Sequence, residues 1–239
     1  MILPEMQSKI QSEKLSSITL DNRKGKMYHV INEHAIIKDN GLRNDYTLNF
    51  KLMKTNVYHA RFEGLTKHKA LNEALYRHAI KILEHRSGTE YEDLVIIDAR
   101  TGEFILENTS ASGMRKFQCS LSQAQIDKLK SYGKAFEALH NHPNNSFPSP
   151  SDIKNLFKRK MQRGSTIVCH NGTVYHLAKL KDFVAIEEFL EGITKATTTT
   201  LQGYPEHLIE THISEEIIKR LERAGFLRFK EVPSHETNK

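Results

Sequence analysis

The sequence predicts an α/β fold in which a mixed β-sheet is flanked by helices. Three stretches support this class. An amphipathic pattern over residues 68–86 precedes the apolar run Leu94–Ile97, a strand-like segment at 136–140 precedes a helix start at Ser149, and Asn171-Gly172 separates two β-rich runs. Strands that alternate with helices in this way favour a sheet with helices packed against it.

The central part of the chain, residues 66–181, contains the expected elements in a simple order. Helices are indicated by apolar residues at intervals of three and four, and strands by apolar or β-branched runs bounded by turn residues. We expect a helix at 68–86, a hairpin of strands at 90–98 and 103–107, a helix at 123–131, a strand at 136–140, a helix from Ser149 to Gly164, and a hairpin of strands at 165–170 and 173–177.

The two ends of the chain are harder to interpret. Residues 1–65 form an N-terminal region of unclear role that is partly β, with strand-like runs at 27–31 and 46–52, and the first twenty residues resemble a loosely held helix or an arm. Residues 182–239 are expected to form a C-terminal helical appendage, with helices at 184–193 and 213–224 and a loop of four threonines at 197–200.

Composition narrows the class of protein. In 239 residues, 38% hydrophobic and 27% charged, no stretch approaches the roughly 20 apolar residues of a membrane span, so no membrane partner is expected. The start lacks the pattern of a secretory signal, and the two cysteines form no Cys-x-x-Cys pair, which together favour a cytoplasmic protein without a disulfide framework. The net charge of +6 leaves a nucleic-acid partner open, although the basic residues are spread along the chain.

The stretch around residue 140 has the residue types of a metal site. His140 and His142 are one residue apart, so their side chains lie on the same side of an extended strand. After a polar loop, Ser149 fits a helix N-cap, and Asp152 follows three residues later in the first turn. Two imidazoles and a carboxylate suit zinc, and three protein ligands leave a fourth position for water, as in catalytic zinc sites.

These residues carry a resemblance to a known family. His140-x-His142 followed by Ser149-x-x-Asp152, with a glutamate on the strand after a long helix, resembles the motif of JAMM (JAB/MPN) zinc metalloproteases. The string His-Asn-His-Pro is similar to the bacterial and mobile-element RadC-like branch of that family. The resemblance covers residues 66–181 and implies a JAB/MPN-like fold with cytidine-deaminase-like layering.

The resemblance also implies a role for each residue. His140, His142 and Asp152 would hold zinc, and Ser149 would donate a hydrogen bond to the developing oxyanion. The upstream glutamate would act on the attacking water. Glu92 matches that position, and Glu90, two residues earlier, is the reserve candidate.

One feature departs from the family pattern. Six residues separate His142 from Ser149, where seven are most common in the family. Ser151 is the alternative hydroxyl, but Lys154 stands three residues after it and cannot bind zinc. Loops absorb changes of length more easily than helices, so we expect the site to close.

The sequence therefore predicts a zinc-dependent hydrolase that cleaves a peptide or isopeptide bond in a protein or peptide substrate. The alternative is a non-hydrolytic RadC/JAB-like binding module linked to DNA metabolism or a mobile element. A metal-dependent nuclease or deaminase is a third possibility. His170 and His176 lie near the second hairpin without a matching carboxylate, and we interpret them as ordinary sheet residues.

Overall fold

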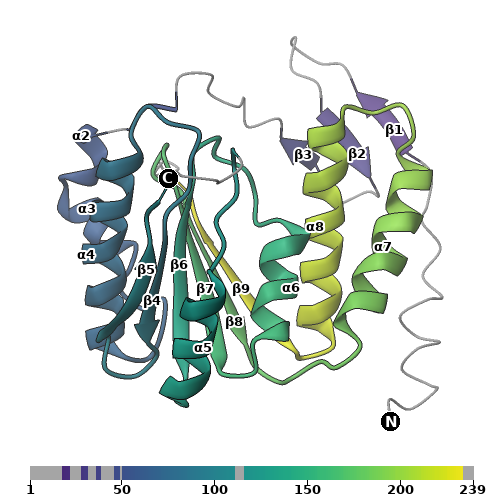
Figure 1. Cartoon of the computed structure of the whole chain (residues 1–239). Coiled ribbons are helices and arrows are strands. Elements are labelled where there is room, and N and C mark those ends of the chain that lie inside the picture. Colours follow the sequence, from purple (N-terminus) through teal and green to yellow (C-terminus); the bar gives the residue numbers. More distant parts are fainter. Residues whose placement is uncertain are drawn as a thin grey trace.

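The computed structural model describes residues 18–21, 28–31, 36–38, 46–48, 50–110 and 116–233 (Figure 1). It confirms the predicted α/β class, because a six-stranded mixed sheet is flanked by helices. A separate three-stranded antiparallel sheet comes from the N-terminal region. Its strands are β1 (Ile18–Asp21), β2 (Tyr28–Ile31) and β3 (Ile36–Lys38).

The six strands of the large sheet lie in the order β5-β4-β6-β7-β8-β9. Only the central pair, β6 and β7, is parallel, and α6 makes the crossover that a parallel pair needs. The strands are β4 (Leu94–Asp98), β5 (Phe104–Asn108), β6 (Phe136–His142), β7 (Gln162–Cys169), β8 (Val174–Lys179) and β9 (Leu227–Val232).

Helices cover both faces of this sheet (Figure 1). On one face α4 packs against β4, β6 and β7, and the short α2 and α3 contribute to the same apolar cluster. On the other face α5 covers β4 and β6, while α6, α7 and α8 cover β7 to β9. The helices are α2 (Phe50–Met53), α3 (Asn56–Ala60), α4 (Lys69–Arg86), α5 (Gln123–Tyr132), α6 (Pro150–Lys158), α7 (Ile186–Thr200) and α8 (Glu206–Arg223).

Strand β4 shows why its apolar run is continuous. All five of its residues are buried, and successive side chains alternate between the two helical layers. Val95 and Ile97 pack in the α4 cluster, whereas Leu94 and Ile96 pack in the α5 cluster. A strand buried on both faces has no polar side, so its sequence shows no alternation.

The predicted end of the helix after Ser149 was wrong. Helix α6 ends at Lys158, and Gly164 lies inside β7 rather than at a helix end. A Cβ atom at Gly164 would overlap the carboxylate of Glu137, which is buried and lies 3.1 Å from both Thr166 Oγ1 and His176 Nε2. Glycine is needed there for close approach, not for a helix stop.

Three flanking segments also differ from expectation. The strand-like run at 46–52 contains the short helix α2, and the threonines at 197–200 form the end of α7 instead of a loop. Two of these threonines, Thr199 and Thr200, donate to carbonyls four residues earlier, which satisfies their hydroxyls within the helix. Strand β9 was not predicted, and it joins the C-terminal region to the sheet by pairing with β8. The first 17 residues lie outside the described part of the chain.

None of the helices in the described residues is both long enough and apolar enough to cross a membrane.

Candidate metal centre

The end of strand β6 presents two buried histidines on one side of the sheet. His140 and His142 are each only 4% exposed, and their Nε2 atoms lie 3.1 Å apart. They point to the side of the sheet that α5 and α6 cover, because they share the strand face of Ala138 in the α5 cluster. The predicted convergence of the two imidazoles is therefore present.

The first turn of α6 brings a carboxylate to the same point. Ser149 and Asp152 form a reciprocal capping box, in which the Asp152 N–H donates to Ser149 Oγ at 3.2 Å and the Ser149 N–H donates to Asp152 Oδ2 at 2.7 Å. Asp152 Oδ1 lies 3.2 Å from Nε2 of His140, and Oδ2 lies 3.5 Å from Nε2 of His142. The helix cap thus fixes the carboxylate that faces both histidines.

These three side chains converge at one point. Nitrogen and oxygen ligands at about 2.0–2.2 Å from a tetrahedral zinc ion lie about 3.3 Å from one another. The two Nε2 atoms lie 3.1 Å apart, Asp152 Oδ1 lies 3.2 Å from His140, and the other oxygen, Oδ2, lies 3.5 Å from His142. Two imidazoles and a carboxylate in such contact are residue types that can hold a metal ion.

Glu92 completes the buried cluster from the segment that leads into strand β4. The β4–β6 ladder ends at the pair Leu94–His140, and Glu92 lies two residues before Leu94, beside the end of β6 that carries His142. Its Oε1 lies 4.0 Å from Nε2 of His142. One ligand atom from each of Glu92, His140 and His142 falls within 4.8 Å of the others, and this buried group could bind a metal ion.

Glu92 lies slightly farther from the histidines than Asp152 does. At 4.0 Å from His142 Nε2 it is farther than Asp152 Oδ2, but within reach of a water molecule at the same centre. Burial raises the pKa of Glu92 above its ordinary value, although His142 and His140 oppose that shift. This position allows Glu92 to act either as a metal ligand or as a proton acceptor for a water molecule at the centre.

The reserve candidate points elsewhere. The carboxylate of Glu90 lies 2.5 Å from Nζ of Lys116, and its carbonyl accepts a hydrogen bond from the Phe117 N–H. Residues 90–93 precede the start of β4, so the strict alternation that places Glu90 and Glu92 on one face does not hold there. The geometry favours Glu92 over Glu90.

The loop after His142 orients its imidazole. Nδ1 of His142 lies 3.0 Å from the carbonyl oxygen of Ser146 and 3.0 Å from its hydroxyl. An N–H at Nδ1 that donates to this carbonyl leaves the Nε2 lone pair free to face the centre. Asn145, with a left-handed φ of 60°, accepts from the Asn171 N–H at 2.7 Å and anchors the loop to the β7–β8 turn. The six-residue connection thus supports the site.

The charges within the cluster reinforce one another. Burial alone would raise the pKa of Asp152, but the charge and hydrogen bond of His140, followed by those of His142, hold it well below its ordinary value. Burial alone would lower the pKa of His142, but the Asp152 hydrogen bond and the Glu92 charge raise it to about 9. Asp152 and His142 thus each favour the charged form of the other.

Three residues near the centre were not singled out from the sequence. The thiol of Cys119 hydrogen-bonds to Glu92, and burial raises its pKa well above the ordinary value. Ser146 contacts His142, and Asn141 lies between the two histidines on the opposite face. Alternation along β6 could have drawn attention to Asn141, whereas Cys119 and Ser146 reach the centre from loops whose course has no sequence signature.

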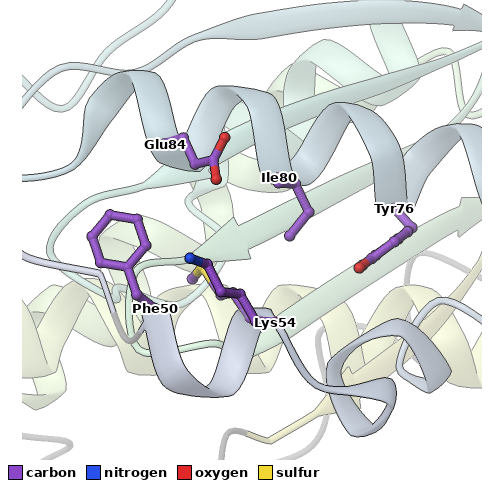
Figure 2. Close-up of a pocket in the computed structure, with 6 residues that line it drawn as sticks. Phe50, Lys54, Tyr76, Ile80 and Glu84 are labelled. Carbon is purple, nitrogen blue, oxygen red and sulfur yellow. The ribbon is translucent and has the colours of Figure 1, made fainter.

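A cavity of about 210 Å³ lies on the other side of the molecule, between α2 and α4. Figure 2 shows side chains of α4 facing Phe50 and Lys54 of the α2 segment. None of the predicted site residues lines it. The lining residues are Phe50, Met53, Lys54, Tyr76, Ile80 and Glu84.

Comparisons of the chain with models of known protein families, with curated proteins and with solved structures found no match. What the fold and the cluster themselves define is an α/β protein with a buried group of side chains that could hold a metal ion.

Proposed function

We propose that the protein is a zinc-dependent hydrolase of the JAMM type that cleaves a peptide or isopeptide bond in a protein substrate. The main support is the convergence of His140, His142 and Asp152, whose nitrogen and carboxylate oxygen atoms approach one another to 3.1–3.5 Å, with Glu92 beside them at 4.0 Å from His142. The resemblance of the motif to the JAMM family agrees with this geometry.

The donor set favours zinc over other common ions. Imidazole nitrogens are poor ligands for magnesium and calcium, which prefer oxygen, and two histidines with one carboxylate suit a catalytic zinc. A zinc ion bound there would lower the pKa of a water molecule to about 7 and polarise the substrate carbonyl.

Glu92 would act as the general base. Its carboxylate is buried and within reach of a water molecule at the centre, so it can take the proton from the attacking water and pass it to the leaving amine. Burial raises the pKa of Glu92, which brings it nearer to neutral pH. A general base is most effective when its pKa lies near the working pH.

Ser149 would stabilise the oxyanion that forms at the substrate carbonyl. Its hydroxyl now donates to Asp152 Oδ2 at 2.7 Å, and it must turn toward the substrate to take this role. Because the Ser149 hydroxyl is already bonded to Asp152, it is not free to bind an oxyanion. This observation favours the second candidate, a RadC/JAB-like binding module that keeps its metal but does not hydrolyse amides.

A cleavage assay distinguishes the two functions. Zinc-loaded protein is incubated with a library of internally quenched peptides and, separately, with lysine-linked isopeptides. We expect cleavage of at least one library that stops when a chelator is added and is at least about 100-fold slower in Glu92→Gln. Retained zinc without any cleavage would support the binding module, and salt-dependent DNA binding would strengthen that alternative.

A further inference from the structure

Asn141 lies between the two predicted zinc ligands and points the other way. It is fully buried, and the period of two along β6 directs its side chain to the α4 face while the histidines face α6. A polar amide in this place must find hydrogen-bond partners, because a buried polar group without a partner loses its hydrogen bonds to water and gains none in return. Its partners indicate what it does.

The Asn141 side-chain amide forms hydrogen bonds with the segment before β4, just beyond the last backbone pair between β4 and β6. The ladder between β4 and β6 ends at the pair Leu94–His140. Beyond it, Asn141 Oδ1 accepts from the Asp93 N–H at 2.8 Å, and Asn141 Nδ2 lies 3.2 Å from the Tyr91 carbonyl oxygen. The Asn141 side chain therefore hydrogen-bonds to the backbone on both sides of Glu92, at Tyr91 and at Asp93.

A histidine behind Asn141 fixes the orientation of the amide. Asn141 Nδ2 lies 3.2 Å from Nε2 of His170, and Nδ1 of His170 lies 2.6 Å from the Tyr46 carbonyl oxygen. Since that carbonyl can only accept, His170 carries its proton on Nδ1 and accepts at Nε2. The amide nitrogen must then face His170, and the amide oxygen must face the Asp93 N–H. Burial, which lowers the pKa of His170, keeps this neutral form.

The neighbouring Asp93 anchors the same segment to α4. Its carboxylate receives the Arg86 Nε–H at 2.5 Å and lies 2.7 Å from Nδ1 of His85. The backbone of residues 91–93 is thus held from the sheet by Asn141 and from the helix through Asp93. Between these two anchored residues, the Glu92 side chain lies 4.0 Å from Nε2 of His142.

We propose that Asn141 is a positioning residue that holds the Glu92 carboxylate at the reacting centre by clamping the backbone of Tyr91 and Asp93. This inference rests on the proposed function, because positioning of Glu92 matters for rate only if Glu92 acts as a base. Asn141 touches neither substrate nor metal, and it acts only through Glu92.

The test replaces Asn141 by leucine, which has a similar volume but no hydrogen-bonding groups. If Asn141→Leu does not yield folded protein, Asn141→Ser replaces it, because its hydroxyl is too short to span both backbone partners. The matched control is Thr166→Val, which removes a buried hydrogen bond on the same face of the neighbouring strand β7, to Glu137.

With an internally quenched peptide as the probe, we expect kcat of the Asn141 variant to fall by about 10- to 100-fold, a part of the 10²–10⁴-fold that a general base supplies. KM and zinc content should stay close to those of the wild type. Thr166→Val should lower thermal stability and leave kcat unchanged. An unchanged kcat in the Asn141 variant, or a loss of zinc, would overturn the inference.

A second measurement does not depend on catalysis. The amide hydrogen of Asp93 should exchange at least about tenfold faster in the Asn141 variant, while that of Ile96 in mid-strand keeps its protection. If the wild type cleaves neither library, the proposed function fails. The exchange rate of the Asp93 amide hydrogen then remains as the test of whether Asn141 holds the backbone beside Glu92. Unchanged Asp93 exchange would overturn the clamp whatever the activity.

Discussion

Oε1 of Glu92, in the segment before β4, lies 4.0 Å from Nε2 of His142 at the end of β6, and both side chains are almost fully buried. Asp152 is closer to the same histidine, at 3.5 Å, and it is also within 3.2 Å of His140. The two carboxylates are therefore expected to have different roles, Asp152 as a ligand and Glu92 as a base.

Replacement of Glu92 by glutamine should separate these roles. The amide cannot accept the proton of the attacking water, so kcat should fall by about 10²–10⁴-fold while zinc content stays near one per chain. Glu90→Gln is the control, since Glu90 pairs with Lys116, and it should leave kcat unchanged. Loss of zinc in Glu92→Gln would instead make Glu92 a ligand, and a slow Glu90→Gln enzyme would reverse the assignment.

Two capping boxes in the part of the chain that the structure describes, at Ser122 and Ser149, allow the structural and chemical roles of Ser149 to be separated. Ser149→Ala removes the cap of α6 and should lower the free energy of unfolding by about 1 kcal/mol. It should also lower kcat by about 10²–10³-fold if the hydroxyl serves the oxyanion. Ser122→Ala removes the equivalent cap of α5 and should cost similar stability with normal kcat. Equal activity of the two variants in a peptide-cleavage assay would exclude Ser149 from catalysis.

Much of the centre could be predicted because its signals are local. Period-two alternation places His140 beside His142, and the N-cap pattern places Asp152 at the start of α6. Asn141 and Ser146 escaped notice because their roles depend on contacts with residues distant in sequence or on the path of a loop. No local pattern encodes such contacts.

The missed elements of the fold have similar causes. The segment 227–232 mixes apolar and charged residues, as an edge strand does, and its pairing with β8 spans the whole of α7 and α8. Gly164 was assigned to a helix end because glycine is common there, whereas the buried carboxylate of Glu137 on another strand requires it.

Gly164→Ala should therefore be costly. The added methyl group overlaps the Glu137 carboxylate, which is held by Thr166 and His176, so we expect a loss of about 1–3 kcal/mol in the free energy of unfolding. The matched control is Gly192→Ala in α7, where a Cβ meets open space and alanine should stabilise the helix by up to about 1 kcal/mol. Urea unfolding of both variants measures the difference, and equal stability would contradict the close packing of β6 against β7.

The lowered pKa of Asp98 predicts that the free energy of unfolding depends on pH. Burial alone would raise its pKa, but hydrogen bonds from Tyr132, Thr101 and Arg100 lower it to about 2. The unfolded value is near 3.9, so this stabilisation is present above about pH 4 and is lost as the pH falls through about 2. Tyr132→Phe removes one of these bonds, at 2.5 Å, and should cost about 1 kcal/mol at pH 6.

The stability difference between the wild type and Tyr132→Phe should shrink as the pH falls from 4 toward 2. Urea unfolding at several pH values measures it. A difference that stays constant over this range would show that Tyr132 stabilises the protein by packing and not through the ionised Asp98.

Zinc content tests the central claim most directly. Protein purified after zinc-supplemented expression should contain about one zinc per chain by elemental analysis, since the proposed function assigns a zinc ion to the converging side chains of His140, His142 and Asp152. His142→Ala and Asp152→Ala should lose the metal, while His207→Ala, which removes an exposed histidine, should keep it. Folded wild-type protein that contains no zinc would contradict the account.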